Sequence, residues 1–185
     1  MEKIDYLALL RGINVGGKNS IKMDLLKKIF EEMKFTDIIT YIQSGNVFFT
    51  DLKNEKLNLA EKIEKALLDK TKCEIIVKVL TLSDIKEIIN GIPNDFGTEN
   101  EIYKYDILFL KEPLTTKEVV KGIKPIESND KIYEGEKAFY AKRIIEKLTG
   151  SYTGQISKKW SNIIVRNLNT TKKLYELMLD RNNNM

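Results

Sequence analysis

A glycine-rich segment joins an apolar run, residues 6–10, to an amphipathic run, residues 23–33, and it reads Arg11-Gly12-Ile13-Asn14-Val15-Gly16-Gly17-Lys18-Asn19-Ser20. Glycine lets the backbone adopt positive φ and lets another group approach bare main chain. Such a turn at the start of a helix directs several N–H groups to one point, where the helix dipole favours an anion. We therefore expect an anion-binding turn, completed by the side chains of Lys18 and Arg11.

This turn is close to the phosphate loop of nucleotide hydrolases, Gly-x-x-x-x-Gly-Lys-[Ser/Thr], when it is read from Gly12. Asn19 stands where that loop carries a hydroxyl for Mg²⁺, and no strand of the sequence ends in a convincing aspartate for the metal. Nucleotide hydrolysis is therefore not the expectation. Two interpretations remain open, which are anion binding without hydrolysis and a glycine turn that only shapes the fold.

Composition places the chain among globular proteins of one domain or two small subdomains. It has 185 residues, of which 42% are hydrophobic and 31% charged. No apolar run approaches the ~20 residues of a membrane helix, and the first one is too short for a secretion signal, so we expect a cytoplasmic protein. The single cysteine and the lack of histidine exclude internal disulfides and histidine-dependent triads and metal sites. We expect neither a metal nor a cofactor.

Positive charge collects near the C-terminus, although the formal net charge is only +4. From Lys142 onward the chain has nine lysines and arginines against three aspartates and glutamates. A basic section of this kind favours an acidic partner such as a nucleotide or nucleic acid. The alternative is that these residues are solvated on exposed helix faces. The sequence leaves the oligomeric state undetermined.

Hydrophobic periodicity predicts an α+β fold with two α+β subdomains. Residues 4–10, 38–42, 47–50 and 75–80 are strand-like, and residues 23–33 and 56–70 are helix-like. Their order is βαββαβ, the ferredoxin-like pattern, which we assign to a subdomain of residues 1–92. Thr81 and Asp84 have the spacing of a capping box at the start of a further short helix.

Residues 93–185 are expected to form a second α+β subdomain with a basic C-terminal helical segment. We expect a strand over 106–110, a helix over 116–121, a hairpin of 131–133 with 138–141, and helices over 144–148 and 170–179. The last five residues, 181–185, are expected to be frayed.

The second polar turn is Gln43-Ser44-Gly45-Asn46, between two β-branched and aromatic runs. Its side chains suit a sugar, base or phosphate oxygen, but nothing in the sequence forces this turn close to the first one. The alternative is a tight turn without a ligand. Ser44 has no histidine partner, so a role as nucleophile has no support. The βαββαβ order also raises the RNA-recognition fold, with Tyr6 and Phe48 as stacking residues on its first and third strands.

Residues 8–17 and 40–47 together resemble the opening of a widespread bacterial family, the domain of unknown function 1697. Arg166-Asn167-Leu168-Asn169-Thr170 resembles the family's Arg-Asn-Trp-Asn-Thr segment, with Leu168 in place of the tryptophan. The resemblance implies a cytoplasmic α+β protein of two subdomains with no established activity. It also suggests that the polar residues of the two turns and of residues 166–170 form the family's distinguishing surface.

The leading hypothesis is a protein that binds a phosphate-bearing ligand, nucleotide or nucleic acid, at the turn of residues 11–20. The alternatives are an enzyme of unrecorded activity on such a ligand and a structural or interaction protein. We name no catalytic residue and no metal ligand. The expected ligand-binding residues are Arg11, Asn14, Gly16, Gly17, Lys18, Asn19, Gln43, Ser44, Asn46, Arg166 and Asn167.

Overall fold

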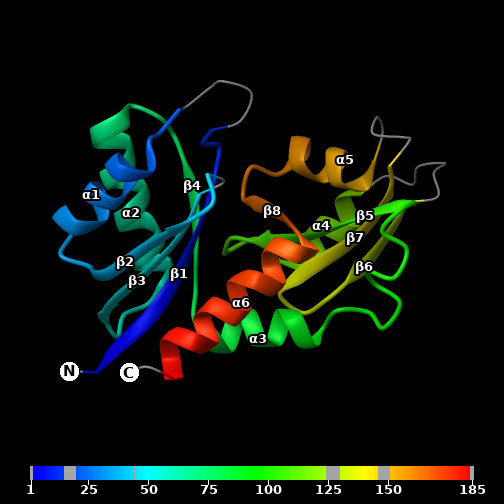
Figure 1. The fold of residues 1–185 in the computed structure, drawn as a ribbon. Coiled ribbons are helices and arrows are strands. Elements are labelled where there is room, and N and C mark those ends of the chain that lie inside the picture. Colours follow the sequence, from blue (N-terminus) through cyan, green and yellow to red (C-terminus); the bar gives the residue numbers. More distant parts are fainter. Residues whose placement is uncertain (1, 15–19, 44, 124–129, 146–150, 184–185) are drawn as a thin grey trace. The chain divides into compact units, whose positions relative to one another are not determined.

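The chain forms two compact units in the computed structural model, which describes residues 2–14, 20–43, 45–123, 130–145 and 151–183 (Figure 1). The first unit combines Met1–Asp84 with Leu177–Met185, and the second is Ile85–Glu176. Each unit contains a four-stranded sheet. The α+β fold class expected from the sequence is therefore confirmed. The division into two subdomains after residue 92 remains a prediction.

The first unit has the expected ferredoxin-like βαββαβ order. Its strand order is β2-β3-β1-β4, and every neighbouring pair of strands is antiparallel. Its elements are β1 (Lys3–Arg11), α1 (Met23–Glu32), β2 (Thr36–Tyr41), β3 (Asn46–Leu52), α2 (Lys56–Thr71) and β4 (Ile76–Leu80).

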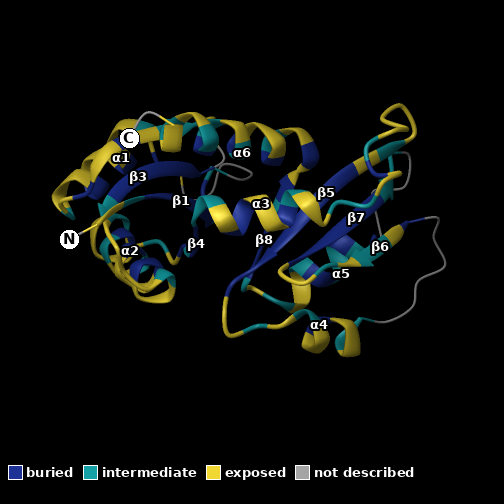
Figure 2. Cartoon of the chain, turned by 90° about the horizontal axis from the view of Figure 1, so that it is seen from below, coloured by how far each residue is buried: buried dark blue, intermediate teal, exposed yellow. Residues whose placement is uncertain are grey.

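Helices α1 and α2 pack on one face of this sheet, and Figure 2 colours most of the central strands as buried. Leu26, Ile29 and Phe30 of α1 are buried because their spacing of three and four residues places them on one side of the helix. Tyr6 of β1 lies in the same core, where its ring stacks on Phe49 at a centroid distance of 5.4 Å. Tyr6 is only 1% exposed, so the alternative in which it stacks on an RNA base is wrong.

The second unit has the same βαββαβ order and the equivalent strand order, β6-β7-β5-β8, again antiparallel throughout. The sequence predicted its hairpin but not this second ferredoxin-like topology. Ile144 ends a strand and does not begin the helix expected over 144–148, most of which lies outside the described residues. The elements are β5 (Tyr103–Leu110), α4 (Thr116–Gly122), β6 (Lys131–Glu134), β7 (Ala138–Ile144), α5 (Tyr152–Lys159) and β8 (Ile163–Asn167).

Two helices contribute residues to both units, namely α3 (Leu82–Asn90) and α6 (Leu168–Asn183). Helix α6 continues past the predicted end at residue 179, and Arg181 is not frayed because its Nη2 donates to Asp5 Oδ1 at 2.7 Å. None of the helices described is long and apolar enough to cross a membrane.

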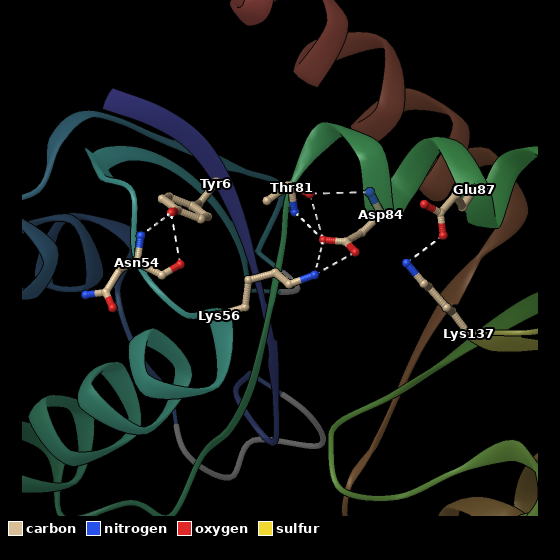
Figure 3. Close-up of polar contacts among 7 residues, drawn as sticks. All are labelled: Tyr6, Asn54, Lys56, Thr81, Asp84, Glu87 and Lys137. Atoms are coloured by element: carbon tan, nitrogen blue, oxygen red, sulfur yellow. Dashed lines mark hydrogen bonds and ion pairs between the residues drawn. The ribbon is translucent and has the colours of Figure 1, made fainter. Parts of the chain in front are cut away.

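The capping box at the start of α3 is confirmed. The Thr81 backbone N donates to Asp84 Oδ2 at 2.8 Å, and the Asp84 N donates to Thr81 Oγ1 at 3.4 Å. Lys56 Nζ donates to both carboxylate oxygens of Asp84 at 2.7 Å (Figure 3). Burial alone raises the pKa of Asp84, but the hydrogen bonds from Lys56 and Thr81 outweigh it and lower the pKa to about 2.

Candidate functional site

The two N-terminal turns lie at the same end of the first sheet. Strands β1 and β3 are antiparallel with Leu9 opposite Asn46, so the end of β1 and the start of β3 are neighbours. The Leu10 N–H donates to the Gly45 carbonyl at 2.8 Å. The pairing register therefore brings together two segments whose proximity the sequence left open. We call residues 11–14 with residues 43, 45 and 46 the paired turns.

Asn14 joins the two turns through its side chain. Its Nδ2 donates to the Gln43 carbonyl at 3.0 Å and to the Ile21 carbonyl at 3.1 Å, while its Oδ1 accepts from the Ile21 N–H at 2.9 Å. Its φ of 53° is left-handed, which asparagine tolerates better than most residues. Asn14 thus ties together the two ends of the segment 15–20 and acts as a positioning residue for the paired turns.

Gly45 allows the close approach of the two turns. A Cβ at this position would lie 2.7 Å from Ile13 Cδ1 and 2.8 Å from Leu10 Cβ, and the φ of Gly45 is +76°. Any larger residue would clash with Ile13 and Leu10 and would also be strained at this positive φ. The sequence places Gly45 in a polar turn between two strand-like runs, but it does not reveal the close approach to Leu10 and Ile13.

The side chains of Asn46 and Gln43 differ in exposure. Asn46 is completely buried, and its Nδ2 donates to the Tyr41 carbonyl at 3.1 Å, which closes the turn between β2 and β3. Gln43 is exposed, and its amide offers both a donor and an acceptor to solvent. Gln43 is therefore the described side chain of this turn that a ligand can reach, while Ser44 lies outside the described residues.

Arg11 brings a positive charge to the paired turns from the end of β1. Its side chain is partly exposed, and burial of the rest lowers the pKa of its guanidinium below the usual arginine value. Arginine stays charged at neutral pH despite such a shift. The other residues predicted for this turn, Gly16, Gly17, Lys18 and Asn19, lie outside the described residues.

Arg166 and Asn167 belong to the second unit and have structural contacts there. Arg166 is 9% exposed, its Nη1 donates to the Val165 carbonyl at 2.9 Å, and burial lowers its pKa to about 10. The Asn167 Oδ1 accepts from the Thr170 N–H at 2.7 Å at the start of α6, as a helix cap does. The two N-terminal turns come together within one unit, whereas this third predicted segment lies in the other.

A cavity of about 360 Å³ in the first unit was missed by sequence reasoning. It is lined by residues of β1, β2 and β3 together with the end of α6, including Asp5 and Arg181. The signal in the sequence was Asp5 within the strand-like run of residues 4–10, because a buried carboxylate needs a partner. Among the described residues, no group of three or more cysteine, aspartate or glutamate side chains is arranged to hold a metal ion.

Comparison with known proteins places the chain among proteins without an assigned function. A solved structure, "The structure of conserved bacterial protein SP0830 from Streptococcus pneumoniae", is 25% identical, covers 96% of this chain and 99% of that one, and has a TM-score of 0.79. No curated protein matches the sequence. A family model described as "Protein of unknown function (DUF1697)" matches residues 4–140, which include the paired turns. This chain belongs to that family, DUF1697.

Proposed function

We propose that this protein acts in the cytoplasm and binds a phosphate-bearing ligand, a nucleotide in the first instance, at the paired turns. The observation that carries the proposal is the linkage made by Asn14. One of its three hydrogen bonds joins the first turn to Gln43 of the second turn. The other two join Asn14 to Ile21. The fold thus maintains a preformed polar surface beside a positively charged side chain.

Two side chains of this surface suit a phosphate. The guanidinium of Arg11 presents donors in a planar fork that matches two phosphate oxygens. The exposed amide of Gln43 can accept from a sugar hydroxyl or donate to a phosphate oxygen. Lys18, which lies outside the described residues, is expected from the sequence to add a second cation. Asn14 and Gly45 position the turns, while Arg11 and Gln43 contact the ligand.

A thermal-shift screen against nucleotides, sugar phosphates and short oligonucleotides tests this proposal. A ligand at 100 times its Kd stabilises the folded state by about 2.7 kcal/mol, so a true ligand raises the melting temperature. Arg11→Gln should weaken the affinity about tenfold, because a charge-assisted hydrogen bond is worth about 1.5 kcal/mol. Lys28→Gln removes an exposed charge from α1 and should leave the affinity unchanged.

Three results distinguish the alternatives. Failure of every phosphate compound to raise the melting temperature, or an Arg11→Gln variant with unchanged affinity, contradicts the proposal. Binding of oligonucleotides that weakens steeply with salt would identify nucleic acid as the ligand, because phosphate contacts release counterions. Turnover of a bound compound that Ser44→Ala abolishes in a folded protein would establish the enzyme alternative.

A further inference from the structure

Ile42, directly before the second of the paired turns, has a backbone conformation that its side chain disfavours. Its φ is +49°, which is left-handed, and β-branched residues adopt this region least readily. Elsewhere in β2 a positive φ falls on Asp37, in a β-bulge where the register against β3 shifts between Thr36 and Ile39. Aspartate tolerates that conformation, as asparagine does at position 14. Ile42 is therefore under backbone strain that these residues avoid.

Hydrogen bonds on both sides of Ile42 maintain this strain. The carbonyl of Tyr41, just before it, accepts from Asn46 Nδ2 at 3.1 Å. The carbonyl of Gln43, just after it, accepts from Asn14 Nδ2 at 3.0 Å. Strained backbone persists where the surrounding structure over-determines it, and such positions cluster at ligand-binding and active sites. The contacts that build the paired turns are thus the contacts that hold Ile42 in its conformation.

Packing does not account for an isoleucine at this position. Ile42 is 48% exposed, so much of its apolar surface remains in water. Asparagine or glycine would fit the φ without the strain, and asparagine would also suit the exposure. The free protein therefore gains neither a relaxed backbone nor full burial from this side chain. A bound molecule that covers Ile42 would supply the missing burial.

Ile42 and Arg11 lie at the same end of the first sheet, on strands that flank β3. Tyr41 pairs with Asn46, and Asn46 pairs with Leu9, so the ends of β2, β3 and β1 are level here. Neighbouring strands are about 4.8 Å apart, which puts the backbones at Ile42 and Arg11 on the order of 10 Å apart. A nucleotide separates its base from its phosphate by a ribose, so one molecule can reach both residues.

We propose that Ile42 contacts the base of the ligand, so that the paired turns bind a nucleotide and not a sugar phosphate. This inference rests on the proposed function. The face of the base covers the exposed side chain of Ile42, while Arg11 binds the phosphate and Gln43 contacts the sugar. Apolar side chains are among those on which bound bases stack. Because such a contact depends on the area of the ring and not on its edges, purines and pyrimidines both bind, purines more tightly.

Three probes test the proposal on the full chain. They are adenosine monophosphate, uridine monophosphate and ribose 5-phosphate, which has the sugar and the phosphate but no base. Calorimetry and the shifts of backbone amide resonances measure the affinities. Both nucleotides should bind at least about tenfold more tightly than ribose 5-phosphate, because the base and Ile42 remove apolar surface of each other from water.

Variants separate the strain from the binding. Ile42→Asn should raise the melting temperature of the free protein by about 2–4 °C, because asparagine tolerates the left-handed conformation. The same variant should weaken both nucleotides about tenfold and leave ribose 5-phosphate unchanged. Ile42→Leu keeps an apolar side chain and should retain the nucleotide affinities within about twofold. Ile39→Asn is the matched control, because Ile39 is 53% exposed on the preceding strand without a positive φ, and it should alter neither nucleotide affinity.

Several outcomes would overturn the role of Ile42. These are ribose 5-phosphate binding as tightly as both nucleotides, nucleotide affinities that Ile42→Asn leaves unchanged, and a melting temperature that this variant does not raise. If Arg11→Gln still weakens all three probes in such a case, the proposed function stands and only this inference fails. Failure of all three probes to bind would contradict the proposed function, and this inference with it.

Discussion

The two units share one topology, but they differ in the side chains on one face of the sheet. This is the face opposite α1 and α2 in the first unit, and opposite α4 and α5 in the second. In the first unit this face bears Asp5 and Thr50, which hydrogen bond to Arg181 beside a cavity. In the second unit the equivalent face bears Tyr105 and Tyr140, against which the ring of Phe96 packs. The aromatic rings cover this face in the second unit, whereas in the first unit the hydrogen-bonded network of Asp5, Thr50 and Arg181 lies beside an open cavity. The topology sets the framework, and the residues on this face set what each unit can bind.

The largest effect is expected in the aromatic cluster of the second unit. Phe96 is 6% exposed, and its ring lies 4.7 Å from that of Tyr105 and 6.0 Å from that of Tyr140. Phe96→Ala should lower the free energy of unfolding by about 3 kcal/mol, through lost burial and the cavity left behind. Denaturation in urea measures this loss, and Phe96→Leu should recover part of it. A loss below about 1 kcal/mol would contradict the view that aromatic packing closes this face.

A slightly smaller effect is expected in the polar network of the first unit. Arg181→Met should lower the free energy of unfolding by about 3 kcal/mol or less, because it leaves the buried Asp5 carboxylate without its countercharge. The double variant Asp5→Asn with Arg181→Met should regain most of the loss, since it removes both charges. Urea denaturation of both single variants and the double variant forms the cycle. Additive losses would show that the two side chains are not coupled.

The next effect concerns acid stability. The folded-state pKa of Asp84 is lowered to about 2, whereas the unfolded-state pKa of an aspartate is near 4. The charge of Asp84 therefore stabilises the folded state fully above about pH 4, and this stabilisation is lost as the pH falls to about 2. Asp84→Asn should therefore lower the free energy of unfolding by about 2 kcal/mol at pH 7 and by much less at pH 2. Denaturation across this pH range measures both values. An equal loss at both pH values would contradict a role of the charge.

The smallest effect is expected at the exposed ion pair of the second unit. Lys137 Nζ lies 2.5 Å from Glu87 Oε2, but the two side chains are 40% and 49% exposed (Figure 3). Lys137→Gln should change the free energy of unfolding by less than about 0.5 kcal/mol, because solvent screens the attraction. Paired with Asp84→Asn, this variant sharpens the contrast between an ion pair whose carboxylate is buried, Lys56–Asp84 in the first unit, and one whose carboxylate is exposed, Lys137–Glu87 in the second. A loss of stability in Lys137→Gln as large as that in Asp84→Asn would contradict this screening by solvent.

The first unit was predictable because its elements carry strong local patterns. Leu26 and Phe30 mark one side of α1, and β-branched residues mark the strands. The second unit was harder, because α5 has only eight residues, of which Thr153 and Ile156 are buried. Gly154 also lies within it and weakens its helical propensity. With few apolar positions and an internal glycine, α5 carries little helical signal in the sequence.

The candidate sites depend on contacts between distant residues, which local patterns do not contain. The proximity of Asn14 to Gln43 follows from the register of β1 and β3. The cavity depends on Arg181 reaching Asp5, across a separation of 176 residues. The sequence could indicate that Asp5 needs a partner, but it could not identify Arg181 as that partner.

The bulge in β2 has a further consequence for how the chain meets its neighbours. Strand β2 is at an edge of its sheet, and such an edge can pair with a strand of a second molecule and begin aggregation. The shifted register between Thr36 and Ile39 interrupts the row of backbone donors and acceptors, and a charged side chain occupies the interruption. A protein that exposes Ile39 at 53% is thereby protected against intermolecular strand addition along this edge.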